Sequence, residues 1–321
     1  MQKANRVCRL KAASMQGSAL VTALFIMTLV AIAATAMSTR LQLDIYRTRL
    51  TILSDKLYLA SQGVSFWTMG ILSDKKNHFH QSDGRTKVAD FPNQFKAIYP
   101  DLLIQGSVYD LQARFNLNNL SDKKYYAFFL KLLKSSIPGM NAASRNNIAS
   151  ATRQWISPYS PENGGDKLLI YYLKQNPPYY PSQQAMESLS EFRLVRGVDA
   201  KTWQLLNDYL TVLPEVTPIN INTAPKNIIM SLGNGLNENQ TKEIMDARGK
   251  DATANQKAIR ALLQKFAIQD NQVTFESNYF MSIAVVKGDD LTLINYSIFK
   301  RRKDKNGKIS VSLLAESLNS L

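Results

Sequence analysis

The chain has 321 residues, of which 45% are hydrophobic, so a folded core is expected and disorder as its main state is excluded. Its formal net charge of +14 suits nucleic acid, an anionic membrane surface or acidic proteins as partners. Two histidines argue against histidine-based catalysis, and a single cysteine, Cys8, excludes a disulfide within the chain.

An uncharged apolar stretch runs from Ser18 to Met37. As a helix it would span about 30 Å, the thickness of the hydrocarbon core of a bilayer. Basic residues precede the stretch, and no acid occurs before Asp44. This asymmetry predicts that the N-terminal end lies in the cytoplasm and that everything after Arg40 lies outside it.

The apolar stretch allows two processing routes. An ordinary signal peptide would be removed at a site of the Ala-x-Ala kind, here Ala34-Thr35-Ala36. A pilin-type leader would instead be cut between Gly17 and Ser18, and the apolar helix would be kept. The segment that follows favours the leader, because a removed signal peptide has no reason to continue unbroken into an amphipathic helix.

Apolar residues recur after this stretch in alternating steps of four and three, and no proline occurs before Pro92. The pattern predicts one helix from Ser18 to about Leu72 with a single apolar stripe. This stripe can pack on the chain's own core or contact the helices of partner subunits. The candidate contact residues are Tyr46, Leu50, Leu53, Leu57, Ala60, Val64, Trp67 and Ile71.

Strand patterns flank a helical region in the rest of the chain. Alternating apolar residues predict a strand over 111–117 and three C-terminal strands around 281–285, 294–298 and 309–313, with hairpin turns between the last three. Residues 73–100 are predicted to form loop and short turns. Helices are predicted over 122–134, 142–155, 199–210, 225–232, 237–248 and 254–266. The fold class is therefore α+β, with an all-helical domain inserted between the strands of an antiparallel sheet.

Two further patterns are typical of functional sites. His78 and His80 form a pair that can hold zinc, but no cysteine and few acids accompany them, so a solvated loop is the better interpretation. Residues 221–248 resemble a helix-hairpin-helix, whose Gly233-Asn234-Gly235 turn would present N–H groups to a phosphate. The alternative function is thus a membrane-anchored nucleic-acid-binding protein. An enzyme is not expected, because the sequence has no Gly-rich phosphate loop, nucleophile elbow or zinc-spaced ligand set.

Four segments carry a family resemblance, and they are specific through their order and spacing. They are QGSALVTALFIMTLVA from residue 16, ARFNLNNL at 113–120, NPPYYPSQQAMESLSEFRLVRGV at 176–198 and PININTAP at 218–225. In this order they resemble the type II secretion protein K family, the large minor pseudopilin of Gram-negative secretion systems. The resemblance implies a pilin-like fold, in which the long N-terminal helix packs on the sheet.

The resemblance also implies a function, a location and partners. The function would be structural, as a minor pseudopilin at the tip of the pseudopilus in protein export across the outer membrane. The chain would cross the bacterial inner membrane once, with its C-terminal domain in the periplasm. Its partners would be the minor pseudopilins I and J, other pseudopilins, the inner-membrane secretion platform and the prepilin peptidase. Nucleic acid is not expected as a partner.

Two departures from the family pattern affect these expectations. Where relatives carry a D-W-x-D-x-D loop and bind calcium, residues 154–159 read QWISPY and lack all three acids. Calcium prefers about six to eight oxygen ligands, including carboxylates, so we expect weak calcium binding or none, with Glu162 and Asp166 as the remaining candidate ligands. Thr22 stands where major pilins have a glutamate that pairs with the freed amine of a neighbouring subunit.

The expected organisation follows from these segments. Residues 1–17 form the leader and 18–40 the transmembrane part of the helix. Residues 41–119 form the first part of the pilin-like domain and 276–321 its C-terminal strands. Residues 120–275 form the inserted helical domain, with the helix-hairpin-helix-like segment at 218–249.

Overall fold

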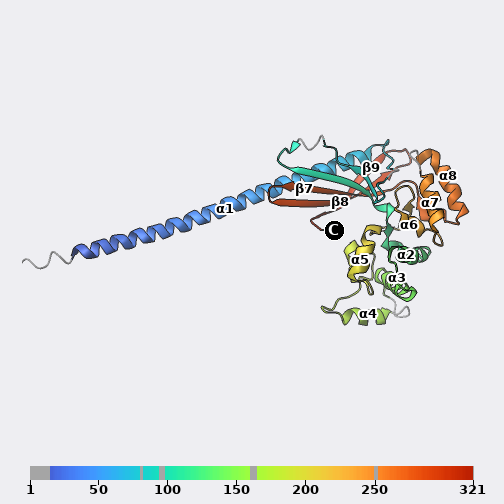
Figure 1. Ribbon diagram of the computed structural model, residues 1–321, viewed down its shortest axis with the longest axis horizontal. Coiled ribbons are helices and arrows are strands. Elements are labelled where there is room, and N and C mark those ends of the chain that lie inside the picture. The colour runs from blue at the N-terminus through green and yellow to red at the C-terminus, as the bar shows by residue number, and fades with distance from the viewer. Residues whose placement is uncertain (1–14, 80–81, 94–97, 160–164, 249–251, 321) are drawn as a thin grey trace, which may run out of the picture. The chain divides into compact units, whose positions relative to one another are not determined.

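One long helix dominates the N-terminal part of the chain (Figure 1). The computed structural model describes residues 15–79, 82–93, 98–159, 165–248 and 252–320, and divides the chain into two compact units, Met1–Lys56 and Leu57–Leu321. Helix α1 (Met15–Ser73) begins in the first unit and ends in the second. The predicted single helix is confirmed, as expected for a segment without proline and with sustained apolar periodicity.

A five-stranded antiparallel sheet forms in the second unit, with the strand order β1-β2-β7-β8-β9. The predicted C-terminal meander is confirmed as β7, β8 and β9, and a tight turn with Gly307 at a φ of +75° joins the last two. The bounds are β1 (Lys87–Asp90), β2 (Leu103–Asp110), β7 (Tyr279–Gly288), β8 (Leu291–Lys303) and β9 (Ile309–Leu318).

The last part of α1 packs on this sheet. Leu57, Ala60 and Val64 are buried, and the hydroxyls of Ser65 and Ser297 lie 3.0 Å apart in a hydrogen bond between helix and sheet. Gly106 of β2 permits a close approach, since a Cβ added there would lie 2.6 Å from Cγ1 of Val64. A glycine in the strand thus sets the distance between helix and sheet.

The helical region is inserted between two neighbouring strands. The chain leaves the sheet after Asp110 of β2 and returns at Tyr279 of β7, and Asp110 pairs with Phe280 in the register. Within the second unit, the helices gather at one end of the sheet (Figure 1), around one hydrophobic cluster that extends from Phe115 to Val273. The helices are α2 (Lys124–Ser136), α3 (Ala142–Ile156), α4 (Gly165–Leu173), α5 (Ala200–Leu206), α6 (Lys226–Met230), α7 (Glu238–Ala247) and α8 (Ala252–Lys265).

Short 3₁₀ helices and two-residue strands connect these helices. The strands pair in parallel, β3 (Phe115–Asn116) with β4 (Leu210–Thr211) and β5 (Ile219–Asn220) with β6 (Val273–Thr274). The 3₁₀ helices are η2 (Leu111–Ala113), η3 (Leu117–Ser121), η5 (Leu189–Leu194), η6 (Asn207–Tyr209) and η7 (Asp270–Gln272).

The strand predicted over 111–117 is wrong. This segment forms η2, β3 and the start of η3, and the regular strand β2 ends before it, at Asp110. The alternation misled because both alternating sets, the apolar one with Leu111 and Phe115 and the polar one with Gln112 and Asn116, are buried. Residues 73–100, predicted as loop, contain β1, and the helices α4 and η5 were not predicted.

Buried asparagines from the motif at 113–120 hold the base of the insertion together. The side chain of Asn116 accepts from the N–H of Leu213 (3.1 Å) and donates to the carbonyl of Glu215 (2.8 Å). Asn119 makes both kinds of hydrogen bond to the backbone of Thr217, at 2.8 and 2.9 Å. The asparagines of this motif therefore provide hydrogen-bond partners for backbone N–H and carbonyl groups of the loop at 213–217. A side-chain amide suits this role because it can both donate and accept.

Asp110 is a fully buried carboxyl group at the junction of sheet and insertion. It accepts hydrogen bonds from Ser277 (2.7 Å), Asn220 (2.9 Å) and Thr223 (2.5 Å). Burial raises the pKa of Asp110, and these hydrogen bonds oppose that shift. The segment at 218–225 thus joins the end of β2 to the insertion through the side chains of Asn220 and Thr223.

Candidate partner interface on the anchor helix

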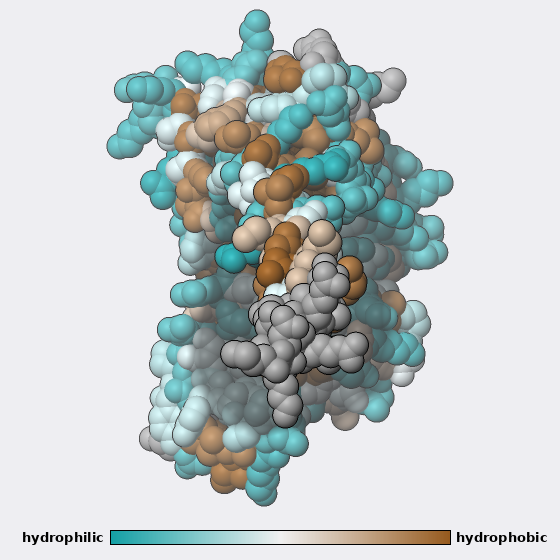
Figure 2. Space-filling model, turned by 90° about the vertical axis from the view of Figure 1, so that its left-hand side faces the viewer, coloured by the Kyte–Doolittle hydropathy of each residue, from teal (hydrophilic) through white to brown (hydrophobic). Residues whose placement is uncertain are grey.

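The first unit provides a membrane-compatible segment. Among the described residues, α1 is the one helix long and apolar enough to cross a bilayer, and its most apolar window is exposed. Figure 2 looks at the molecule from the side of the N-terminal end of α1, where apolar residues appear as brown groups. Gly17 and Ser18, the residues of the predicted cleavage site, both lie in α1, near its first described residue, Met15.

The hydroxyl of Thr22 forms its hydrogen bond within α1. It donates to the carbonyl of Ser18, one turn earlier, over 2.7 Å. A threonine bonded to its own helix is compatible with a bilayer, because its polar group needs no further partner. The chain therefore presents no carboxylate at this position to a neighbouring amine.

The structure divides the predicted contact stripe into three groups. Leu57, Ala60 and Val64 are buried by the chain's own packing and cannot reach a partner. Tyr46 is exposed. The remaining members are half-buried, and these are Leu50, Leu53, Trp67 and Ile71. For the buried three, core packing is the role that the structure supports.

A second apolar stripe, which the sequence interpretation missed, lies on the other side of α1. It consists of Ile45, Ile52, Leu59 and Phe66, spaced by seven residues, and these side chains are between 59% and 69% exposed. At 100° per residue, Leu59 lies opposite the buried face near Leu57, and a seven-residue spacing keeps the four on one side. The seven-residue repeat in the sequence was the pattern that could have predicted this second stripe.

Two glycines accompany the exposed stripe. Gly63 and Gly70 follow Leu59 and Phe66 by four residues, so they lie on the same side of the helix. An added Cβ would meet nothing within 4 Å at either position. Large apolar side chains next to glycines offer knobs and holes to another helix.

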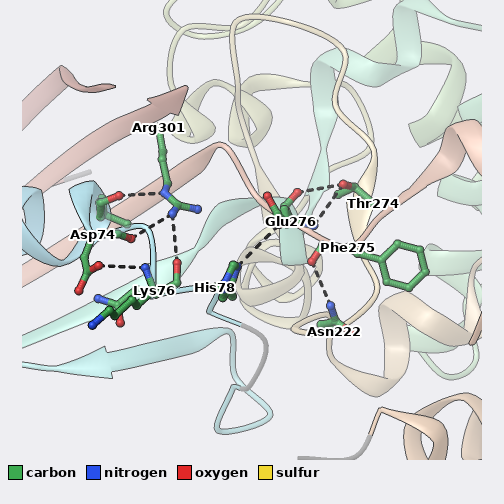
Figure 3. A network of polar contacts seen from close by, with 10 residues as sticks. Asp74, Lys76, His78, Asn222, Thr274, Phe275, Glu276 and Arg301 are labelled. Atoms are coloured by element: carbon green, nitrogen blue, oxygen red, sulfur yellow. Dashed lines mark hydrogen bonds and ion pairs between the residues drawn. The ribbon is translucent and has the colours of Figure 1, made fainter. Parts of the chain in front are cut away.

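Arg301 of β8 fixes the C-terminal end of α1 (Figure 3). Its guanidinium donates to the carbonyls of Leu72 (2.8 Å), Asn77 (3.1 Å) and Asp74 (3.3 Å). Burial lowers the pKa of Arg301, and the charges of Glu276 and Asp74 oppose that shift. A cation at the carbonyl end of a helix is favourable, so this residue anchors α1 to the sheet.

Weak calcium binding or none remains the prediction for the loop at 154–159. Gln154, Ser157 and Tyr159 stand at the three positions where the family pattern has acids, and Tyr159 donates a hydrogen bond to Asp166. Glu162, the other candidate, lies outside the described residues. Within the described ranges, no three His, Cys, Asp or Glu side chains are grouped so that they could hold a metal. The donors at this loop are neutral where calcium prefers carboxylates.

In the helix-hairpin-helix-like segment, backbone N–H groups of the turn donate to carbonyls of the same segment. In its turn, the N–H of Gly235 donates to Leu232 (2.9 Å), and the N–H of Leu236 donates to Met230 (2.8 Å). Helix α7 begins with Glu238, which forms an ion pair of 3.1 Å with Lys226. A phosphate would meet occupied N–H groups and a carboxylate, so the nucleic-acid alternative is not supported.

Of the two histidines, the structure describes His78. His78 is about half exposed, and its Nδ1 lies 3.8 Å from a carboxylate oxygen of Glu276 (Figure 3). His80 lies outside the described residues. The contact of His78 with Glu276 by itself supplies neither a nucleophile nor a metal site.

Comparisons with known proteins agree with this architecture. A family model described as type II secretion system (T2SS), protein K matches residues 113–215. The type II secretion system protein K of Aeromonas hydrophila is 27% identical over 322 residues, which cover 90% of this chain and 93% of that protein. The protein K of Pseudomonas aeruginosa is 26% identical over 213 residues, 63% of this chain and 61% of that protein.

A solved structure has the same fold. It is described as the GspK-GspI-GspJ complex of the type 2 secretion system of enterotoxigenic Escherichia coli. The match has a TM-score of 0.62 at 20% identity and covers 86% of this chain and 100% of the other. The long helix on an antiparallel sheet with a helical insertion is a pilin-like fold, and the predicted fold class is confirmed. The chain is therefore similar to type II secretion system protein K over most of its length, in line with the resemblance of its motifs.

Proposed function

We propose that this chain is the minor pseudopilin at the tip of a type II secretion pseudopilus, with a structural role in protein export across the outer membrane, and that it is not an enzyme. The observation that carries the proposal is the pilin-like fold, similar over the full length of the matched chain of the GspK-GspI-GspJ complex. In this role α1 crosses the bacterial inner membrane once, and the residues after Arg40 lie in the periplasm.

Two features support a position at the tip. Thr22 hydrogen-bonds within its own helix and supplies no acid for the amine of a subunit above it. The insertion between β2 and β7 is large, with a radius of gyration of about 15 Å for roughly 170 residues by compact-domain scaling. Such bulk would crowd a subunit stacked directly above, whereas the end of the filament leaves it free.

The exposed stripe suits the helices of the partner pseudopilins I and J. Ile52 and Leu59 are two of its members, and burying an apolar side chain of this size contributes about 1.5–3 kcal/mol. Tyr46, a member of the predicted contact stripe, is exposed and can extend the interface. Other pseudopilins, the inner-membrane secretion platform and the prepilin peptidase are further proposed partners.

Cysteine cross-linking in cells tests this interface. After cleavage at Gly17 the chain contains no native thiol, since Cys8 lies in the leader. Ile52→Cys and Leu59→Cys should cross-link to single cysteines in the helices of pseudopilins I or J. Ser54→Cys, exposed and 200° around the helix from Ile52, is the matched control and should not. Equal cross-linking at all three positions, or none at positions 52 and 59, would contradict the interface.

A further inference from the structure

A cleft of about 460 Å³ lies in the helical insertion, between the start of α2, the end of α3 and the loop that follows α3. Lys123, the residue that precedes α2, and Arg153 of α3 both line it. The polar groups beside them include Gln154, Ser157 and Tyr159. Of the described residues that line the cleft, two are cationic and none is acidic.

Three described acids, Asp122, Asp166 and Glu191, each have a partner other than Lys123 and Arg153. Asp122 forms an ion pair of 3.0 Å with Lys124, and Asp166 accepts a hydrogen bond from Tyr159. Glu191 accepts from the indole N–H of Trp155 (3.2 Å) and closes a capping box at the start of η5. Within the described part of the chain, neither Lys123 nor Arg153 therefore has a carboxylate partner.

Two like charges on one cleft repel each other, and a bound anion would remove that repulsion. We propose that this cleft binds a carboxylate side chain of an acidic peptide segment from a partner protein. Arg153 offers a planar fork of donors that matches a carboxylate, and Lys123 adds a second positive charge. The loop that the family resemblance associates with a cation thus lines a site for an anion in this chain.

The walls of the cleft favour a peptide over a free ion. Pro158, Pro181 and Leu168 contribute apolar surface, and Tyr126 adds an aromatic ring. A small inorganic anion would leave this surface without a partner, whereas an acidic side chain on a peptide backbone would cover it. The proposal is independent of the position in the filament, because no residue of the exposed α1 stripe lines the cleft.

The test uses the full chain in detergent micelles and titration calorimetry with the peptide acetyl-Ala-Glu-Ala-amide. The Glu peptide should bind at one site, more weakly as the salt concentration rises, and the matched Gln peptide should bind at least tenfold more weakly. Arg153→Gln and Lys123→Gln should each weaken binding about tenfold. Lys242→Gln and Lys257→Gln, which remove the same charge from exposed sites on α7 and α8, should leave it unchanged.

Several outcomes would overturn the proposal. These are equal binding of the Glu and Gln peptides, equal losses in the control variants, or inorganic phosphate binding as tightly as the Glu peptide. Micromolar calcium binding that is lost in Glu162→Gln or Asp166→Asn would show a cation site instead. Arg153 makes no described side-chain hydrogen bond or ion pair, so Arg153→Gln should fold, and an unchanged unfolding temperature checks this. In the Arg153→Gln variant, the cross-links from α1 should persist. This result distinguishes a failure of the cleft proposal from a failure of the tip assignment.

Discussion

Gly106 shows how one residue sets the packing of α1 on the sheet. A Cβ at this position would lie 2.6 Å from Cγ1 of Val64 and 2.9 Å from Cβ of Phe91. Both neighbours are held, since Val64 is fully buried in the helix and Phe91 donates its N–H to the carbonyl of Gly106 over 2.8 Å. Helix and sheet cannot separate at this point without loss of buried contacts.

Gly106→Ala should therefore lower the free energy of unfolding by about 1–3 kcal/mol, the usual cost of overpacking a core. Gly70→Ala is the matched control, because its Cβ meets nothing within 4 Å and alanine favours a helix by about 0.5–1 kcal/mol. Urea unfolding of the two variants measures the difference. A Gly106→Ala protein as stable as the Gly70→Ala protein would show that the close approach is wrong.

Leader processing is also decided at single residues. Cleavage between Gly17 and Ser18 should leave a mature chain that begins at Ser18, methylated by analogy with the family, and keeps all of the apolar stretch. Mass spectrometry of the membrane-bound protein gives the N-terminus directly. An N-terminus at Met37 would instead indicate a removed signal peptide and would leave the protein without its anchor.

At the scale of elements, Arg301 of β8 holds the C-terminal end of α1. The sequence predicted the helix and its length, but not Arg301, because its partners, the carbonyls of Leu72, Asp74 and Asn77, are more than 220 residues away. Periodicity reports which side of an element is buried, and it does not report which distant backbone groups need a donor.

Arg301→Met should leave these three carbonyls without their donor and lower the free energy of unfolding by roughly 1–3 kcal/mol. Hydrogen exchange should speed up in the last turn of α1, at Leu72 and Ser73. Arg302→Met changes the same residue type at the exposed neighbouring position and should alter stability by less than about 0.5 kcal/mol. Equal effects of the two substitutions would mean that Arg301 does not cap the helix.

The predictable and unpredictable parts of the fold differ in their physical origin. The meander β7-β8-β9 and α1 follow from regular periodicity over long segments. The segment 111–117 misled because it is buried on all sides, and the roles of Asn116 and Asn119 depend on backbone groups about 100 residues away. The exposed stripe was present in the sequence as a seven-residue repeat, but only the structure shows which of the two stripes of α1 is free.

At the scale of the whole molecule, the chain combines an anchor, a sheet that holds it and a bulky insertion. In the proposed role, the anchor and sheet serve a filament subunit, while Thr22 and the insertion disfavour a subunit stacked above. The proposed position at the end of the filament accommodates these properties together. The stripe that contains Leu59 and Phe66 would then join this chain to the subunits below it.

The copy number of this chain in isolated pseudopili tests the tip assignment most directly. Quantitative mass spectrometry of filaments sorted by length should find a constant, small number of copies per filament, whatever the amount of the major subunit. A copy number that rises in proportion to the major subunit would place the chain along the whole filament and contradict the account.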